Sequence, residues 1–185
     1  LLGTESARIL GKQKQMGLLV ELTLLEHFVR ENPAALLGWK GPSGAAHDFR
    51  FESFELEAKS TNRKEGWFLA ISSLDQLQTH ADRPLYLAVG RIESDEAGDL
   101  SIPDKIDEIL GHGVDSNHLF DALADVGYLS VDTEAYRQVR FNLPEKRVFV
   151  VADEFPRLTR ESLKESVPER VQGVSYDVDL NDLDE

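Results

Sequence analysis

The chain has 185 residues, of which 41% are hydrophobic and 29% are charged, and its formal net charge is −14 at pH 7. This composition is typical of a globular protein with a sizeable core and excludes a disordered or membrane-embedded chain. The acidic excess argues against general nucleic-acid or anionic-membrane binding, because both surfaces would repel the protein. The absence of cysteine excludes disulfide frameworks, zinc fingers and thiol catalysis, and it fits the cytoplasmic location that we expect.

An amphipathic helix is predicted over residues 18–30, near the start of the chain. Apolar side chains recur there at spacings of four, three and four residues, which places them on one stripe of a helix. The stripe consists of Leu18, Leu22, Leu25 and Val29. Pro33 then ends the helix, and the glycines between residues 38 and 44 predict a loop.

Two short segments after this loop, residues 47–51 and 54–60, alternate in the period of a strand. The later elements follow from similar patterns of apolar residues, prolines and glycines. They are strands at 67–72 and 84–91, a short helix at 73–78, helices at 103–110 and 117–126, and a hairpin of strands 139–142 and 147–152. This mixture of strands and helices predicts an α/β or α+β fold.

No change in composition marks a second domain, so we expect a single domain over residues 1–176. Residues 177–185 are rich in acids and contain no base, which predicts a frayed or solvated acidic tail. The first residue is leucine rather than methionine. The alternative that the chain is the C-terminal part of a longer protein therefore stays open.

The segment between residues 47 and 61 carries the most informative side chains. Pairing its two strands as a hairpin around residues 52 and 53 gives one register that separates apolar from charged side chains. The cross-strand pairs are Asp48 with Glu57, Phe49 with Leu56, and Arg50 with Glu55. Lys59 shares a face with Glu57, whereas alternation directs His47 to the opposite face, where we expect a structural role.

Two carboxylates placed opposite each other repel unless a positive group lies between them. A divalent cation suits Asp48 and Glu57, because carboxylate oxygens and retained waters are the ligands that Mg²⁺ prefers. Lys59 could then orient a water bound to the ion or neutralise charge in the transition state. The alternative interpretation is a solvated strand face on which Glu57 and Lys59 form an ordinary salt bridge.

The pattern Asp-x8-Glu-x-Lys on adjacent strands after an acidic helix resembles the PD-(D/E)XK superfamily of restriction-endonuclease-like nucleases. More narrowly, the chain is similar to a PD-(D/E)XK family from bacterial restriction and phage-defence gene clusters. The matching segments are 17–25 (GLLVELTLL), 38–42 (GWKGP), 47–49 (HDF), 56–61 (LEAKST), 71–73 (ISS) and 76–77 (QL). One departure is His47, which stands where the superfamily motif has proline.

The resemblance implies a mixed β-sheet core flanked by helices, and a metal site of Asp48 and Glu57 for Mg²⁺ or Mn²⁺. It also implies a third carboxylate from the first helix, in a catalytic set completed by Lys59. Glu21 is our choice for that carboxylate, because it falls inside the apolar arc, where an acid is costly unless paired or metal-bound. The alternative is Glu26, at the edge of the arc and four residues before Arg30, which predicts a surface salt bridge.

We therefore expect a Mg²⁺-dependent DNA endonuclease that acts in restriction–modification or phage defence. The family implies DNA as substrate, a methyltransferase or ATPase subunit as partner, and a homodimer for double-strand cleavage. The net charge of −14 is the main argument for an alternative, a catalytically silent nuclease-like subunit that binds other proteins in a defence complex. A second alternative is a protein whose acidic surface mimics DNA. It explains the sequence less well, because it gives no role to Lys59, which lies between apolar strands.

Overall fold

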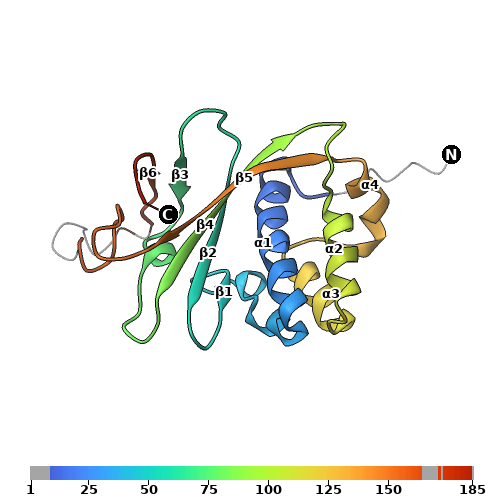
Figure 1. Cartoon of the computed structure of the whole chain (residues 1–185), viewed down its shortest axis with the longest axis horizontal. Helices are drawn as coiled ribbons and strands as arrows, with labels where there is room; N and C mark the ends of the chain where they lie inside the picture. Colours follow the sequence, from blue (N-terminus) through green and yellow to red (C-terminus); the bar gives the residue numbers. More distant parts are fainter. Residues whose placement is uncertain (1–8, 164–170, 172, 185) are drawn as a thin grey trace. The chain divides into compact units, whose positions relative to one another are not determined.

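The computed structural model describes residues 9–163, 171 and 173–184 (Figure 1). The chain forms two compact units. The first, here the helical unit, comprises Leu1–Leu37 and Ile92–Leu143; the second, here the strand unit, comprises Gly38–Arg91 and Pro144–Glu185. Two long strands, β4 (Leu85–Ser94) and β5 (Phe141–Val150), carry residues of both units. The prediction of a single domain over 1–176 remains a prediction.

The helical unit is built from α1 (Lys12–Glu31), α2 (Ile102–Gly111), α3 (Ser116–Asp125) and α4 (Thr133–Arg137). Helix α1 contains the predicted helix and begins earlier, and all four members of its apolar stripe are buried. Helices α1 and α2 lie side by side (Figure 1). Capping residues fix where two helices begin: the hydroxyl of Ser101 accepts a hydrogen bond from the Asp104 amide, and Asp115 accepts one from the His118 amide. Short 3₁₀ helices at Pro33–Gly38 and Ser130–Asp132 complete the helical connections.

The strand unit contains β1 (Phe49–Arg50), β2 (Glu55–Thr61), β3 (Phe68–Ile71) and β6 (Tyr176–Asp179), with 3₁₀ helices at Gly41–Ser43 and Leu74–Leu77. One sheet has the strand order β1-β2-β4-β5, in which β2 is antiparallel to β1 and parallel to β4. Strands β3 and β6 form a separate antiparallel pair. The core of this unit is a buried cluster of aliphatic and aromatic side chains: Trp67, Leu69, Ile71, Leu77, Leu85, Leu87, Val89, Phe149, Val151, Val178 and Leu180.

The predicted hairpin over residues 139–152 is wrong, because these residues form one continuous strand, β5. The prediction took Leu143 to Lys146 as a turn on account of Pro144. Strand β5 is the last strand in its sheet, and an edge strand tolerates a proline because one side of its backbone needs no partner in the sheet.

Where the structure describes the expected frayed or solvated acidic tail, its acids are exposed to solvent but part of it is an ordered strand, β6; residue 185 lies outside the described residues. Strand β6 pairs with β3, and Val178 and Leu180 are buried while Asp177 and Asp179 are exposed. The acids therefore occupy the solvent side of an alternating strand whose apolar side completes the core.

The predicted mixed α/β class is confirmed: helices accompany a four-stranded sheet that contains both parallel and antiparallel pairs. Among the described residues, no helix has the length and apolar character needed to cross a membrane.

Candidate functional site

Strands β1 and β2 pair in the register that the sequence predicted. Phe49 lies opposite Leu56 and Arg50 lies opposite Glu55. Asp48 directly precedes β1, and its side chain reaches the backbone of β2 at Ala58, the residue after Glu57. The short β1–β2 connection therefore brings together two acids that are nine residues apart in sequence.

Asp48 is held in place by the backbone of β2. Its Oδ2 accepts a hydrogen bond of 2.8 Å from the amide of Ala58. Burial raises the pKa of the Asp48 carboxyl, although the Ala58 hydrogen bond and the nearby positive charge of Lys59 act in the opposite direction. The Asp48 carboxylate is thus fixed in position. Its hydrogen bond and the charge of Lys59 do not fully offset the effect of burial on its pKa.

Glu57 and Lys59 form a close ion pair on β2, with 2.9 Å between Lys59 Nζ and Glu57 Oε1. The side chain of Glu57 is only 3% exposed, and that of Lys59 is 16% exposed. Because Lys59 also acts on the charge of Asp48, its ammonium group is the positive group shared by the two acids. The structure therefore brings Asp48, Glu57 and Lys59 together.

This arrangement has the chemistry of a divalent-cation site. Two carboxylates on rigid strands supply the hard oxygen ligands that Mg²⁺ and Mn²⁺ favour. Burial raises the pKa of Asp48, and a nearby cation would act in the opposite direction. Lys59 adds a positive group at the same place.

A second polar cluster lies at the start of β2, around the buried side chain of Glu55. Its Oε2 is 3.1 Å from His47 Nδ1 and 2.9 Å from His80 Nδ1, and its Oε1 is 3.2 Å from Arg50 Nε. Burial would raise the pKa of Glu55, but the hydrogen bond from His80 and the charges of His47, His80 and Arg50 lower it overall. Burial lowers the pKa of His47 against the opposing influence of Glu55.

The position of His47 corrects the sequence prediction. Strict alternation directed His47 away from the acidic face, whereas its ring contacts Glu55 on that face. The pairing of β1 is limited to two residues, and His47 and Asp48 lie in the bend before it, where strand alternation does not apply. His80 was missed altogether, because no sequence spacing links it to residues more than twenty positions earlier.

The helix carboxylates Glu21 and Glu26 both lie on α1, in the helical unit, and thus outside the unit that contains Asp48 and Glu57. Glu21 is partly buried between the buried residues Val20 and Leu22, as its place in the apolar arc predicted. The predicted pairing of Glu26 with Arg30 is wrong: Glu26 Oε1 instead lies 2.9 Å from His112 Nε2. Arg30 contacts His27 and Glu31.

Comparison with known proteins gives one match. No curated protein and no solved structure matches the chain. The family described as "Putative PD-(D/E)XK family member, (DUF4420)" matches residues 1–181, which is nearly the whole chain and extends well beyond the segments that carried the resemblance in sequence. The chain therefore belongs to this PD-(D/E)XK nuclease-like family.

Proposed function

We propose that the protein is a Mg²⁺- or Mn²⁺-dependent DNA endonuclease that acts in restriction–modification or phage defence. The observation that carries the proposal is the assembly of Asp48, Glu57 and Lys59 at the β1–β2 junction. Family membership supports the same activity, and Asp48, Glu57 and Lys59 are the residues that match the superfamily motif in sequence.

Each residue has a distinct role in this proposal. Asp48 and Glu57 would hold the divalent cation, and the resemblance in sequence implies Glu21 as a further, assisting carboxylate. When bound, the cation stabilises negative charge on the phosphoryl oxygens and lowers the pKa of a bound water. Lys59 positions the attacking water through its ammonium group and offsets the charge that develops on the phosphate.

The reaction is hydrolysis of a phosphodiester bond. The oxygen of water forms a new bond to phosphorus, the bond from phosphorus to one sugar oxygen breaks, and the departing oxygen takes up a proton. Holding the water beside the phosphate accounts for part of the increase in the rate of hydrolysis. The translational and rotational entropy of the water is then lost on binding rather than in the chemical step.

Binding of DNA by a chain with a net charge of −14 requires a local group of cations. The strand unit contains three arginines packed on aromatic rings, two of which also pair with Glu145. The guanidinium groups of Arg91 and Arg147 lie 4.4 and 4.7 Å from the ring centre of Trp67, and that of Arg63 lies 5.0 Å from the ring centre of Phe68. These arginines belong to the same unit as Asp48, Glu57 and Lys59.

The test is cleavage of supercoiled and linear DNA in Mg²⁺ or Mn²⁺, with and without methylation of the substrate. The wild type should cut DNA and Asp48→Asn should not, whereas the exposed control Asp153→Asn should cut like the wild type. Equal cleavage by Asp48→Asn would contradict the assigned site. No cleavage by the wild type on any substrate would favour the alternative of a silent interaction subunit.

A further inference from the structure

The cluster around Glu55 combines two imidazoles and one carboxylate, outside the set of Asp48, Glu57 and Lys59. The ligand atoms of His47, Glu55 and His80 all lie within 4.8 Å of one another. We propose that these three residues form a separate binding site for a divalent transition-metal ion of the zinc type, with an open fourth position.

The distances within the cluster are close to those of a metal site. In a tetrahedral site with metal–ligand bonds of about 2.0–2.2 Å, neighbouring ligand atoms lie roughly 3.3–3.6 Å apart. The shared oxygen of Glu55 lies 3.1 Å from His47 Nδ1 and 2.9 Å from His80 Nδ1. Entry of an ion thus requires the oxygen of Glu55 to move from each imidazole nitrogen by only a few tenths of an ångström.

Burial also holds two of the three candidate ligands in place. The side chains of His47 and Glu55 are 2% and 4% exposed, so the strand unit holds both in place. Among the described residues, His47 Nε2 is buried without a hydrogen-bond partner, and the ring is held through Nδ1 at the oxygen of Glu55. The other oxygen of Glu55 is occupied by Arg50, which would act as the outer partner that orients a metal-binding carboxylate.

The exposure of His80 supplies an entry path and a place for exchangeable ligands. Its side chain is 52% exposed, so an ion could reach the cluster from solvent and retain a water there. Three protein ligands with one open position is the arrangement of zinc sites that react rather than merely support structure. A bound ion would also join the segment that carries Asp48 to the start of β2, because His47 directly precedes Asp48 in the chain.

The ligand chemistry separates this site from the proposed nuclease site. Imidazole nitrogens suit zinc, cobalt, nickel and copper, whereas the all-carboxylate pair of Asp48 and Glu57 suits magnesium and manganese. The two sites should therefore respond to different ions and to different substitutions. The proposal of a transition-metal site does not depend on the proposed nuclease activity.

The experiment is titration of the untagged full chain with Co²⁺, followed by visible absorption and by calorimetry. A chain without cysteine gives no thiolate bands, so any absorption reports nitrogen and oxygen ligands. We expect one tightly bound ion per chain. His80→Ala should weaken binding at least about tenfold, since loss of even an outer partner typically costs 10–100-fold. His118→Ala removes another exposed histidine, in the helical unit, and should leave binding unchanged.

Zn²⁺ provides a second readout, since an ion that binds only the folded chain raises Tm. Zn²⁺ should raise Tm of the wild type and of Asp48→Asn, but not of His80→Ala, whose exposed position leaves the metal-free fold intact. The proposal is overturned if the wild type binds no Co²⁺ or if His80→Ala binds it normally. It is likewise overturned if Asp48→Asn abolishes binding, because the ion would then occupy the carboxylate site.

Discussion

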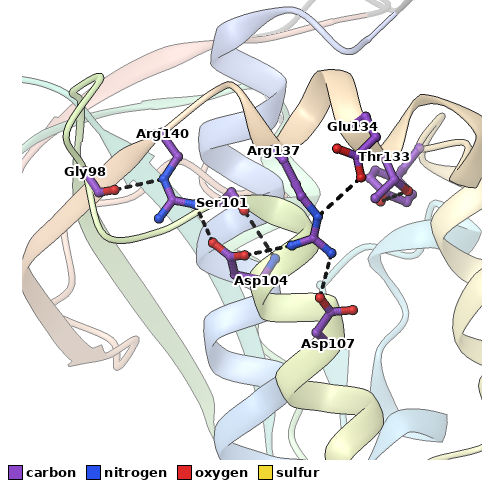
Figure 2. A network of polar contacts seen from close by, with 9 residues as sticks. Gly98, Ser101, Asp104, Asp107, Thr133, Glu134, Arg137 and Arg140 are labelled. Atoms are coloured by element: carbon purple, nitrogen blue, oxygen red, sulfur yellow. Dashed lines mark hydrogen bonds and ion pairs between the residues drawn. The ribbon is translucent and has the colours of Figure 1, made fainter.

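Asp48 of the strand unit and Asp104 of the helical unit are both partly buried acids, but their surroundings differ in one respect. Asp104 accepts hydrogen bonds from Arg137 at 3.0 Å and from Arg140 at 2.6 Å (Figure 2). Burial would raise the pKa of Asp104, yet Ser101 and the two arginines lower it overall. The pKa of Asp48 is raised instead, since the effect of burial outweighs that of the neighbouring groups. One of these groups, Lys59, is also paired with Glu57.

This difference distinguishes a carboxylate that stabilises the fold from one available for chemistry. The arginines around Asp104 are themselves tied down, since Arg137 also contacts Asp107 and Arg140 donates to the carbonyl of Gly98 (Figure 2). The network joins α2 to the segment around α4, and it places two arginines on the single carboxylate of Asp104. Asp48 instead has a fixed position and an excess of negative charge, which is the condition under which a cation binds.

The largest expected effect is on catalysis at Lys59. Lys59→Ala should reduce DNA cleavage by about 10²–10⁴-fold, the range typical of a positioned acid–base group, while the fold is retained. The assay is single-turnover cleavage, with circular dichroism to verify folding. The exposed Lys146→Ala in the same unit is the matched control. Cleavage at the wild-type rate by Lys59→Ala would remove lysine from the mechanism.

The helix carboxylates provide the next comparison. Glu21→Gln should lower cleavage by roughly tenfold or more, because it removes a metal-assisting charge. Glu26→Gln should leave the cleavage rate close to that of the wild type, since Glu26 is engaged with His112. Parallel measurement of kcat for both variants decides between them. The reverse order would assign the assisting role to Glu26.

For Asp104 we expect an effect on stability and none on chemistry. Asp104→Asn should lower the free energy of unfolding at pH 7 by about 1–2 kcal/mol, through loss of charge-assisted hydrogen bonds at a partly exposed site. Since the folded-state pKa is lowered, this stability is present above the ordinary carboxyl pKa and is lost as pH falls through the folded value. Urea unfolding at pH 7 and at about pH 2 should therefore show a difference only at the higher pH.

The control for that experiment is Asp107→Asn, which removes a partner of Arg137 that is more exposed than Asp104 and should therefore cost less. An equal cost for both variants, or a cost for Asp104→Asn that persists in acid, would show that charge balance does not explain the difference.

The smallest effect, and one of opposite sign, is expected at Asp48 in the absence of metal. Because burial raises its folded-state pKa, folding is favoured by protonation, and this advantage is lost as pH rises through the folded value. Asp48→Asn should therefore raise the free energy of unfolding at pH 7 by about 1 kcal/mol or less, and have no effect in acid. Thermal unfolding in a chelator measures it; a lower Tm for the variant would contradict the raised pKa.

The local sequence pattern was sufficient to predict the structure where a short connection and one apolar face determine it. The β1–β2 register was predictable because a slip of one residue would turn Phe49 and Leu56 away from the apolar side. The same register predicts that Asp48, Glu57 and Lys59 lie together.

Prediction failed where distant segments decide the outcome. Pro144 is compatible with a strand only because β5 is at the edge of its sheet, and the acids of β6 are compatible with one only because Val178 and Leu180 meet the core. His80 approaches Glu55 through tertiary folding, and the Arg140–Asp104 contact joins residues 36 positions apart. Neither contact has a periodic signal in the sequence.

The most direct test of the central claim is calorimetric titration of the wild type and of Asp48→Asn with Mg²⁺ and Mn²⁺. We predict binding of Mg²⁺ or Mn²⁺ to the wild type, loss of that binding in Asp48→Asn, and retention in Asp104→Asn once its fold is verified. Binding of equal strength to wild type and Asp48→Asn, or no binding to either with and without DNA, would contradict the assignment of Asp48 as a metal ligand.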